Sequence, residues 1–208
     1  MSDNWNAVYQ GRPYVVKEPY EGVVAFLELI KKEGKRDVLD LGCGDGRHMV
    51  HLVREGFSAA GMDYSLWGTQ RTKEWLDKEG LSAELVCAEA AALPWQSERF
   101  DAVLTFQVIH HQPMEAIRQS VSEVLRVLRP GGYFYAVVPH FPPGEWKDGR
   151  YEEIEEHTFA PTNGFEQGIP HHFFTEEELT SELSGFEVLE VKVDKWGKFY
   201  ALARKKMI

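Results

Sequence analysis

Short apolar runs recur along this chain, and between them apolar residues stand three and four positions apart. The short runs predict strands, and the spaced positions predict helices. Strands are expected at 37–41, 58–63, 83–88, 100–106 and 133–138. The helical pattern is clearest at 114–128, where Ile117, Val121 and Val124 fall on one face. Strands that alternate with helices are typical of a mostly parallel sheet covered by helices on both faces.

Glycines and capping residues mark where further elements begin and end. Helices are predicted at 19–33, 46–55 and 65–79, each followed by a glycine. After residue 174 the pattern changes, because Thr175 and Glu178 form a capping box and strands at 186–193 and 199–204 form a hairpin. The expected fold class is therefore α/β. It is a Rossmann-like, doubly wound, seven-stranded sheet, mostly parallel with an antiparallel last strand.

Composition and charge limit the kind of partner. The chain has 208 residues and a formal net charge of −10, which argues against a nucleic-acid partner. No apolar run approaches the length needed to cross a bilayer, and the polar N-terminus lacks a signal-peptide core. Cys43 and Cys87 make no disulfide framework, which favours a reducing, cytoplasmic location. We expect no nucleic-acid or membrane partner; the oligomeric state is left open.

One domain is expected over residues 1–208. Its predicted parts are an N-terminal cap and helix (1–36), a cofactor-binding core (37–138), an inserted lid (139–174), and a terminal helix with a hairpin (175–208). The long segment 139–174 is expected to be irregular, and it leaves the edge of the sheet where ligands bind in open α/β folds.

The chemistry is concentrated in a glycine-rich turn that follows the first predicted strand. Gly42, Gly44 and Gly46 are spaced G-x-G-x-G, and Arg47 stands where a dinucleotide-binding turn has its third glycine. Asp40 places a carboxylate where a pyrophosphate would lie, so a cationic ligand fits better. S-adenosylmethionine carries a sulfonium and an ammonium and has no phosphate. A tight strand-to-helix turn without a ligand is the alternative interpretation.

Several blocks of sequence resemble the class I S-adenosylmethionine-dependent methyltransferases, of the small, single-domain bacterial type. The blocks are the turn at 38–46, the acid Asp63, the run 88–95, the run 100–111, and the segment 125–132. The resemblance extends from the first predicted helix onward, and the terminal hairpin matches the family's antiparallel last strand. It implies that S-adenosylmethionine is the cofactor.

The expected cofactor site joins the glycine turn to the ends of the next strands. Asp63 lies at the spacing expected for a ribose-hydroxyl acceptor, with a helix N-cap as its alternative role. The resemblance assigns Glu89 to the adenine amino group, although relatives carry Asp there, and Arg12 to the methionine carboxylate. The cofactor-binding residues predicted are Arg12, Asp40, Gly42, Cys43, Gly44, Asp63, Tyr64, Glu89, Ala90, Phe106 and Gln107.

The acceptor is expected to be a small molecule held under the aromatic-rich lid. His111 is the predicted catalytic residue, a candidate general base, although relatives carry a structural histidine there. The acceptor-binding residues predicted are Tyr14, His110, His140, Trp146, His171 and His172. We expect no metal site, because the neighbours His171 and His172 cannot easily face one ion. His48 and His51 are expected on the surface of a helix.

Two other functions stay open. The chain could be a cofactor-binding regulatory module without turnover, or a methyltransferase that modifies protein side chains. A nicotinamide-dependent oxidoreductase is disfavoured by Arg47 and Asp40.

Overall fold

The computed structural model describes residues 2–11, 16–140 and 149–207. Its helices are α1 (Ser2–Gly11), α2 (Glu21–Lys32), α3 (Arg47–Arg54), α4 (Leu66–Lys78), α5 (Met114–Val127) and α6 (Glu176–Glu182). Its strands are β1 (Asp37–Leu41), β2 (Ser58–Asp63), β3 (Glu84–Cys87), β4 (Phe100–Phe106), β5 (Leu128–Pro139), β6 (Tyr151–Glu155), β7 (Thr158–Pro161), β8 (His171–His172), β9 (Phe186–Val193) and β10 (Lys198–Lys205).

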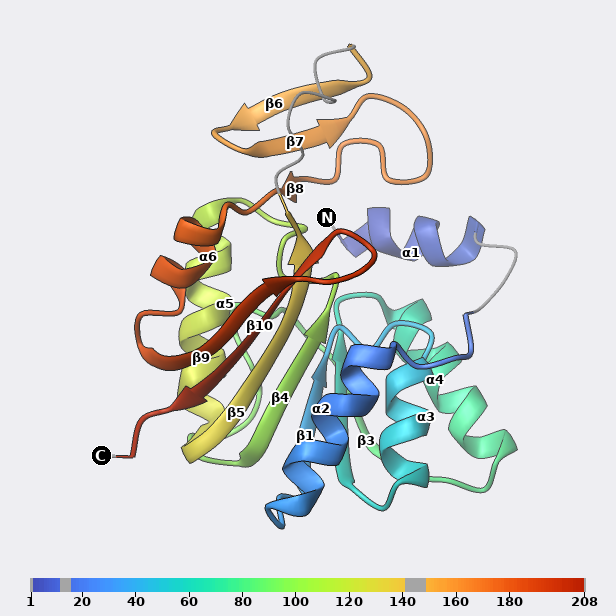
Figure 1. Ribbon diagram of the computed structural model, residues 1–208. Coiled ribbons are helices and arrows are strands. Elements are labelled where there is room, and N and C mark those ends of the chain that lie inside the picture. The colour runs from blue at the N-terminus through green and yellow to red at the C-terminus, as the bar shows by residue number, and fades with distance from the viewer. Residues whose placement is uncertain (1, 12–15, 141–148, 208) are drawn as a thin grey trace.

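Seven strands form the main sheet, in the order β3-β2-β1-β4-β5-β10-β9 (Figure 1). The pairs from β3 to β5 are parallel, and β10 runs antiparallel to both of its neighbours. The predicted sheet, with its antiparallel last strand, is confirmed. The strand order reverses between β1 and β4, and open α/β sheets bind ligands beyond the carboxyl ends of the strands at such a point.

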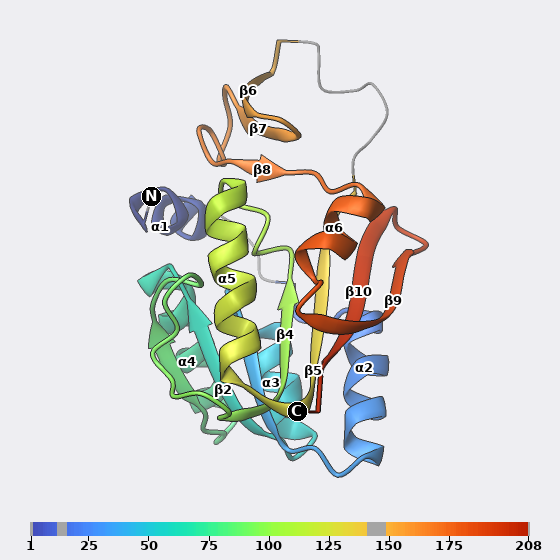
Figure 2. The ribbon, with the colours of Figure 1, turned by 90° about the vertical axis from the view of Figure 1, so that its left-hand side faces the viewer.

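Helices cover both faces of this sheet (Figure 2). On one face, α2 and α3 bury side chains such as Phe26, Ile30 and Met49 against β1, β4 and β5. On the other face, α5 and α6 bury side chains such as Ile117 and Leu179. The two apolar layers hold the carboxyl ends of the strands in fixed positions, and the site is built at that edge.

A second, small sheet stands above that edge, in the order β6-β7-β8 (Figure 1). The expectation of an irregular segment at 139–174 is therefore wrong for β6, β7 and β8. The glutamates of β6 are largely exposed and the strand has no buried apolar face. Its sequence therefore lacks the alternation of apolar and polar residues that predicts a strand. The backbone N–H of His172 donates to the carbonyl of His110 at 2.8 Å, which ties this sheet to the loop after β4.

Local signals at the helix ends agree with the structure. Ser65 caps α4 by accepting the N–H of Gly68, and the Thr175–Glu178 capping box is present at α6. The helix α1 was not predicted. Its Asn6 accepts the hydroxyl of Ser65 at 2.7 Å, so α1 packs on the start of α4.

His48 differs from expectation, because it is buried rather than on a helix surface. Its Nε2 accepts the N–H of Tyr20 at 3.2 Å, and its ring packs edge-on against Phe106. Burial lowers the pKa of His48 to about 3, so the ring is neutral at physiological pH. Among the helices of the described residues, none is long and apolar enough to cross a membrane.

Candidate cofactor and acceptor site

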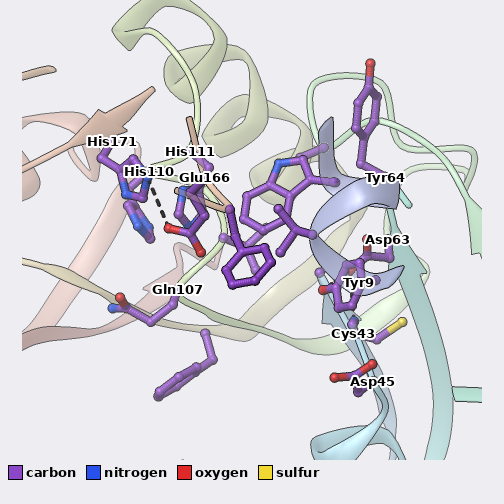
Figure 3. A pocket seen from close by; sticks show the side chains of 18 of the residues that line it. Tyr9, Cys43, Asp45, Asp63, Tyr64, Gln107, His110, His111, Glu166 and His171 are labelled. Carbon is purple, nitrogen blue, oxygen red and sulfur yellow. Dashed lines mark hydrogen bonds and ion pairs between the residues drawn. The ribbon is translucent and has the colours of Figure 1, made fainter. Parts of the chain in front are cut away.

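A cavity of about 850 Å³ opens at the carboxyl edge of β1, β2 and β4. The glycine turn and Asp63 form one end, and three histidines and Glu166 form the other (Figure 3). The helix α1 and the small sheet lie above the carboxyl edge of the main sheet (Figure 1), and residues of both line the cavity. Its volume falls in the upper part of the range usual for ligand pockets, about 300–1,000 Å³. The cavity therefore has room for a nucleoside cofactor and a small second ligand.

The glycine turn is shaped by close packing as well as by backbone conformation. Gly42 has φ +83° and Gly44 has φ +52°, which side chains rarely adopt. A Cβ atom at Gly42 would lie 2.2 Å from Val108 Cγ2, and one at Gly44 would lie 2.6 Å from the Tyr9 hydroxyl. The N–H groups of Gly42 and Cys43 both donate to the carbonyl of Met62, which fastens the turn to β2.

Asp63 ends β2 as a buried carboxylate held by backbone donors. Its Oδ2 accepts the N–H of Gly44 at 2.8 Å, and its Oδ1 accepts the N–H of Ser65 at 2.8 Å. The Tyr9 hydroxyl lies 3.5 Å from Oδ2. Burial raises the pKa of Asp63, and these hydrogen bonds oppose that shift. Asp63 thus lines the cavity and accepts the N–H of Ser65, which is itself the N-cap of α4, so Asp63 is not that N-cap; its ribose-binding role stays a prediction.

Asp40 lies beneath the turn, 1% exposed, on β1. Neither carboxylate oxygen has a hydrogen-bond partner among the described residues. Burial raises the pKa of Asp40 to about 7; nearby Arg47 opposes this shift and Asp63 adds to it. A buried carboxyl group without a partner is costly, and a cationic or hydrogen-bond-donating ligand would lower that cost.

Two residues at the end of β4, Phe106 and Gln107, also line the cavity. Phe106 lines it with the Arg47 guanidinium 4.5 Å from its ring centroid. Gln107 has φ +56°, a strained conformation for a residue with a side chain. Its buried Nε2 has no hydrogen-bond partner within the part of the chain that the structure describes. The strain places an amide group on the cavity wall, where a ligand can bond to it.

Three histidines meet at the other end of the cavity. The ring centroids of His110 and His111 are 3.8 Å apart, and that of His171 lies 4.5 Å from His111. His171 Nε2 is 3.4 Å from Glu166 Oε2 (Figure 3). Burial lowers the pKa of His110 well below its usual range, and it lowers the pKa of His171 as well. His110 is therefore neutral at physiological pH.

Most predicted site residues line this one cavity. Those that line it are Gly42, Cys43, Gly44, Asp63, Tyr64, Ala90, Phe106, Gln107, His110, His111 and His171. Asp40 lies behind the turn, and exposed Glu89 is outside the lining. His140 packs on Phe199, and His172 bonds to Thr158, so neither lines the cavity. Arg12, Tyr14 and Trp146 fall outside the described residues.

Several lining residues were not predicted from sequence. Trp5, Val8 and Tyr9 come from α1, and their i, i+3, i+4 spacing is the signal that would have indicated an amphipathic helix. In the sequence, Arg47 indicates only that the turn does not fit a dinucleotide; in the structure it also lines the cavity beside the turn. Glu166 lies in a loop without periodicity, so nothing in the sequence marked it.

Comparison with known proteins places the cofactor end in a family. Residues 38–132 match a family profile described as a methyltransferase domain. An S-adenosylmethionine-dependent methyltransferase of Methanosarcina mazei superposes with a TM-score of 0.74 at 25% identity, over 92% of this chain and 100% of that one. Over residues 38–132 in sequence, and over most of its length in fold, the chain is similar to the S-adenosylmethionine-dependent methyltransferases.

Two curated methyltransferases are similar to the central part of this chain. A phthiotriol/phenolphthiotriol dimycocerosates methyltransferase of Mycobacterium tuberculosis is 37% identical over 103 residues, 49% of this chain and 37% of that protein. A fatty-acid O-methyltransferase of Mycolicibacterium smegmatis is 37% identical over 119 residues, 55% of this chain and 42% of that protein. The chain thus spans less than half the length of these relatives.

Proposed function

We propose that this protein transfers a methyl group from S-adenosylmethionine to a small-molecule acceptor. The observation that carries the proposal is the cavity itself. It runs from the glycine turn and Asp63 to a separate end lined by His110, His111 and His171. A site that only held a cofactor would need no second end of this kind.

The residues at the first end fit S-adenosylmethionine. Gly42 and Gly44 leave no side chain between the turn and a ligand. Asp63 presents a buried carboxylate to ribose hydroxyls, and Tyr64 and Ala90 line the cavity where an adenine ring would lie. Asp40 and the Arg47 guanidinium are opposite charges near the turn, suited to the ammonium and carboxylate of a methionine group.

When bound, S-adenosylmethionine supplies a methyl group on a positively charged sulfur that is a good leaving group. The protein's own contribution is then alignment and exclusion of water. Phe106 and Gln107 line the cavity at the end of β4, so they help to position the two reactants. His111 lines the acceptor end, which supports its predicted role as a proton acceptor.

The acceptor end favours a small organic molecule. Tyr151, Pro161 and Phe165 of the small sheet and its loop line the cavity together with Trp5 of α1. These rings bury an apolar body, while the histidines give polar contacts. The curated relatives named above carry lipid and fatty-acid names, which supports a small-molecule acceptor without identifying it. The acidic chain is poorly suited to a nucleic acid.

The test is a transfer assay with S-adenosylmethionine labelled on its methyl group, run against a library of small hydroxyl, thiol, amine and carboxylate compounds. Transfer to a library member, weakened in Asp63→Ala at limiting S-adenosylmethionine, supports the proposal. Tight cofactor binding with no transfer to any compound, peptides included, would instead indicate a regulatory module. Transfer to peptides alone would indicate a protein side-chain methyltransferase.

A further inference from the structure

We propose that His110, His111 and His171 form a binding site for one divalent transition-metal ion at the acceptor end of the cavity. Only the role of the metal rests on the proposed function: an ion bound at this end of the cavity would hold and activate the acceptor. The expectation of no metal site concerns the histidines of segment 139–174 alone. The structure assembles a different set, with two histidines from the loop after β4 and one from β8.

The geometry of the three side chains favours a shared ligand. Each offers a ring nitrogen, and these three atoms lie within 4.8 Å of one another. Imidazole nitrogens on one tetrahedral ion at about 2.0–2.1 Å lie about 3.4 Å apart, so modest inward rotation of the rings completes the set. Imidazole is a preferred ligand of zinc, iron, nickel and copper ions.

The surroundings of the rings give an independent observation. His110 is 2% exposed, and its Nδ1 has no hydrogen-bond partner among the described residues. His171 Nε2 is also buried without an aligned hydrogen bond, although Glu166 Oε2 lies 3.4 Å away. Buried polar atoms without partners are uncommon in proteins, and an ion would satisfy them. A carboxylate at the distance of Glu166 orients a ligating imidazole or supplies an oxygen ligand itself.

The backbone holds this arrangement in place. The His172 N–H donates to the His110 carbonyl at 2.8 Å, which sets His171 beside His110. His172 pairs with Thr158 on β7, so β8 is fixed from its other side as well. The three rings therefore come from two segments that are bonded to each other, which is the kind of rigid support a metal site needs.

Three protein ligands leave a coordination position open toward the cavity, as in catalytic metal sites. A hydroxyl or thiol acceptor bound there loses its proton more readily, because the ion stabilises the electron pair left on oxygen or sulfur. The O–H or S–H bond breaks, the proton passes to solvent, and the anion stays on the metal. In this proposal His111 is a metal ligand, and the acceptor class is a hydroxyl or thiol compound.

The first experiment measures metal binding on untagged protein. The metal-free chain is titrated with Co²⁺, followed by its visible absorption, and with Zn²⁺, followed by calorimetry. We expect one equivalent to bind, and we expect His171→Gln and His110→Gln each to weaken binding by about a hundredfold or more. His51→Gln, on α3 and away from this cavity, is the matched control and should bind as the unchanged protein does.

Binding of S-adenosylmethionine by the same variants separates this inference from the proposed function. If His171→Gln folds and binds the cofactor normally but loses Co²⁺, the metal site is supported. The metal site is overturned if the unchanged protein binds no stoichiometric metal. It is also overturned if His171→Gln and His110→Gln bind the metal as tightly as the unchanged protein does, whatever the cofactor result. In the transfer assay, removing the metal with dipicolinate should abolish turnover of hydroxyl or thiol acceptors. Undiminished turnover would refute the activating role.

Discussion

The backbone N–H of Gly44 donates to Oδ2 of Asp63 at 2.8 Å, joining the glycine turn after β1 to the end of β2. One carboxylate thus stabilises the turn and faces the cavity. The two elements that form the proposed cofactor site are therefore coupled, and a change at Asp63 is expected to affect both the shape of the turn and the binding of the proposed cofactor.

Replacing Asp63 with alanine is expected to weaken binding of S-adenosylmethionine by about 1–3 kcal/mol, or about 5- to 150-fold. The loss arises because a buried carboxylate acceptor is removed and the Gly44 N–H is left without its partner. Calorimetric titration of the cofactor measures it. Asp45→Asn is the control: Asp45 also lines the cavity but pairs with Arg71. Equal affinity in Asp63→Ala and the unchanged protein would remove Asp63 from the site.

Replacing Gly42 with alanine is expected to lower the free energy of unfolding by about 3 kcal/mol or more. The added Cβ would meet Val108 Cγ2 at 2.2 Å, and φ +83° adds strain. Gly34→Ala is a matched control, since Gly34 has φ +75° with nothing within 4 Å, and it should cost only about 1 kcal/mol. Denaturant unfolding compares the two. Similar losses in both variants would show that close packing at Gly42 is unimportant.

Asp40 should make the stability of the ligand-free protein fall as the pH rises. The pKa of Asp40 is about 7 in the folded protein against an ordinary value of 3.8, so the folded protein holds the proton more tightly than the unfolded chain. The contribution of Asp40 to the free energy of unfolding is largest below about pH 4 and is lost as the pH rises through about 7, a change of about 4 kcal/mol at most. Arg47 and Asp63 are the charged groups that act on it.

The measurement is denaturant unfolding at pH values from 4 to 8, comparing the unchanged protein with Asp40→Asn. The variant should lack the part of the decline that belongs to Asp40. Cofactor affinity should also rise with pH in the unchanged protein, because an ionised Asp40 attracts an ammonium group. Parallel pH profiles for the two proteins would contradict the assignment.

His48 should act in the opposite direction. Its pKa is lowered to about 3 in the folded protein, so the unfolded chain binds the proton first. Stability from this group is full above about pH 6.5 and is lost as the pH falls toward 3. His48→Gln should flatten the acid limb of the unfolding profile, and His51→Gln, which is only half-buried, should change it less. An unaltered acid limb in His48→Gln would show that the ring is not buried as described.

Much of the fold could be predicted because its elements carry strong local patterns. The apolar run of β1 and the spaced apolar face of α5 predict these elements correctly, because burial against the sheet requires apolar residues at regular positions in the sequence. The capping box at Thr175 did the same for α6. The strands β6 to β8 left no such mark, because much of the small sheet is exposed and its alternation does not separate apolar from polar residues.

The site was predictable where one short segment builds it and not where distant segments meet. The glycine turn and Asp63 are one strand and one helix apart, so spacing alone connected them. The group of His110, His111 and His171 joins β8 to the loop after β4 through a backbone hydrogen bond between His172 and His110. The pattern of apolar and polar residues along the chain does not indicate such a long-range bond. The buried His48 is a similar case, because its ring accepts a hydrogen bond from the distant Tyr20.

Calorimetric titration of the purified protein with S-adenosylmethionine, with NAD⁺ as the comparison ligand, tests the cofactor assignment most directly. The glycine turn, the buried Asp63, and Asp40, which has no hydrogen-bond partner among the described residues, predict one equivalent of S-adenosylmethionine bound per chain. Binding should be weakened in Asp63→Ala, and NAD⁺ should give no heat of binding. Binding of NAD⁺ at the same stoichiometry, or no binding of S-adenosylmethionine by folded protein, would contradict it.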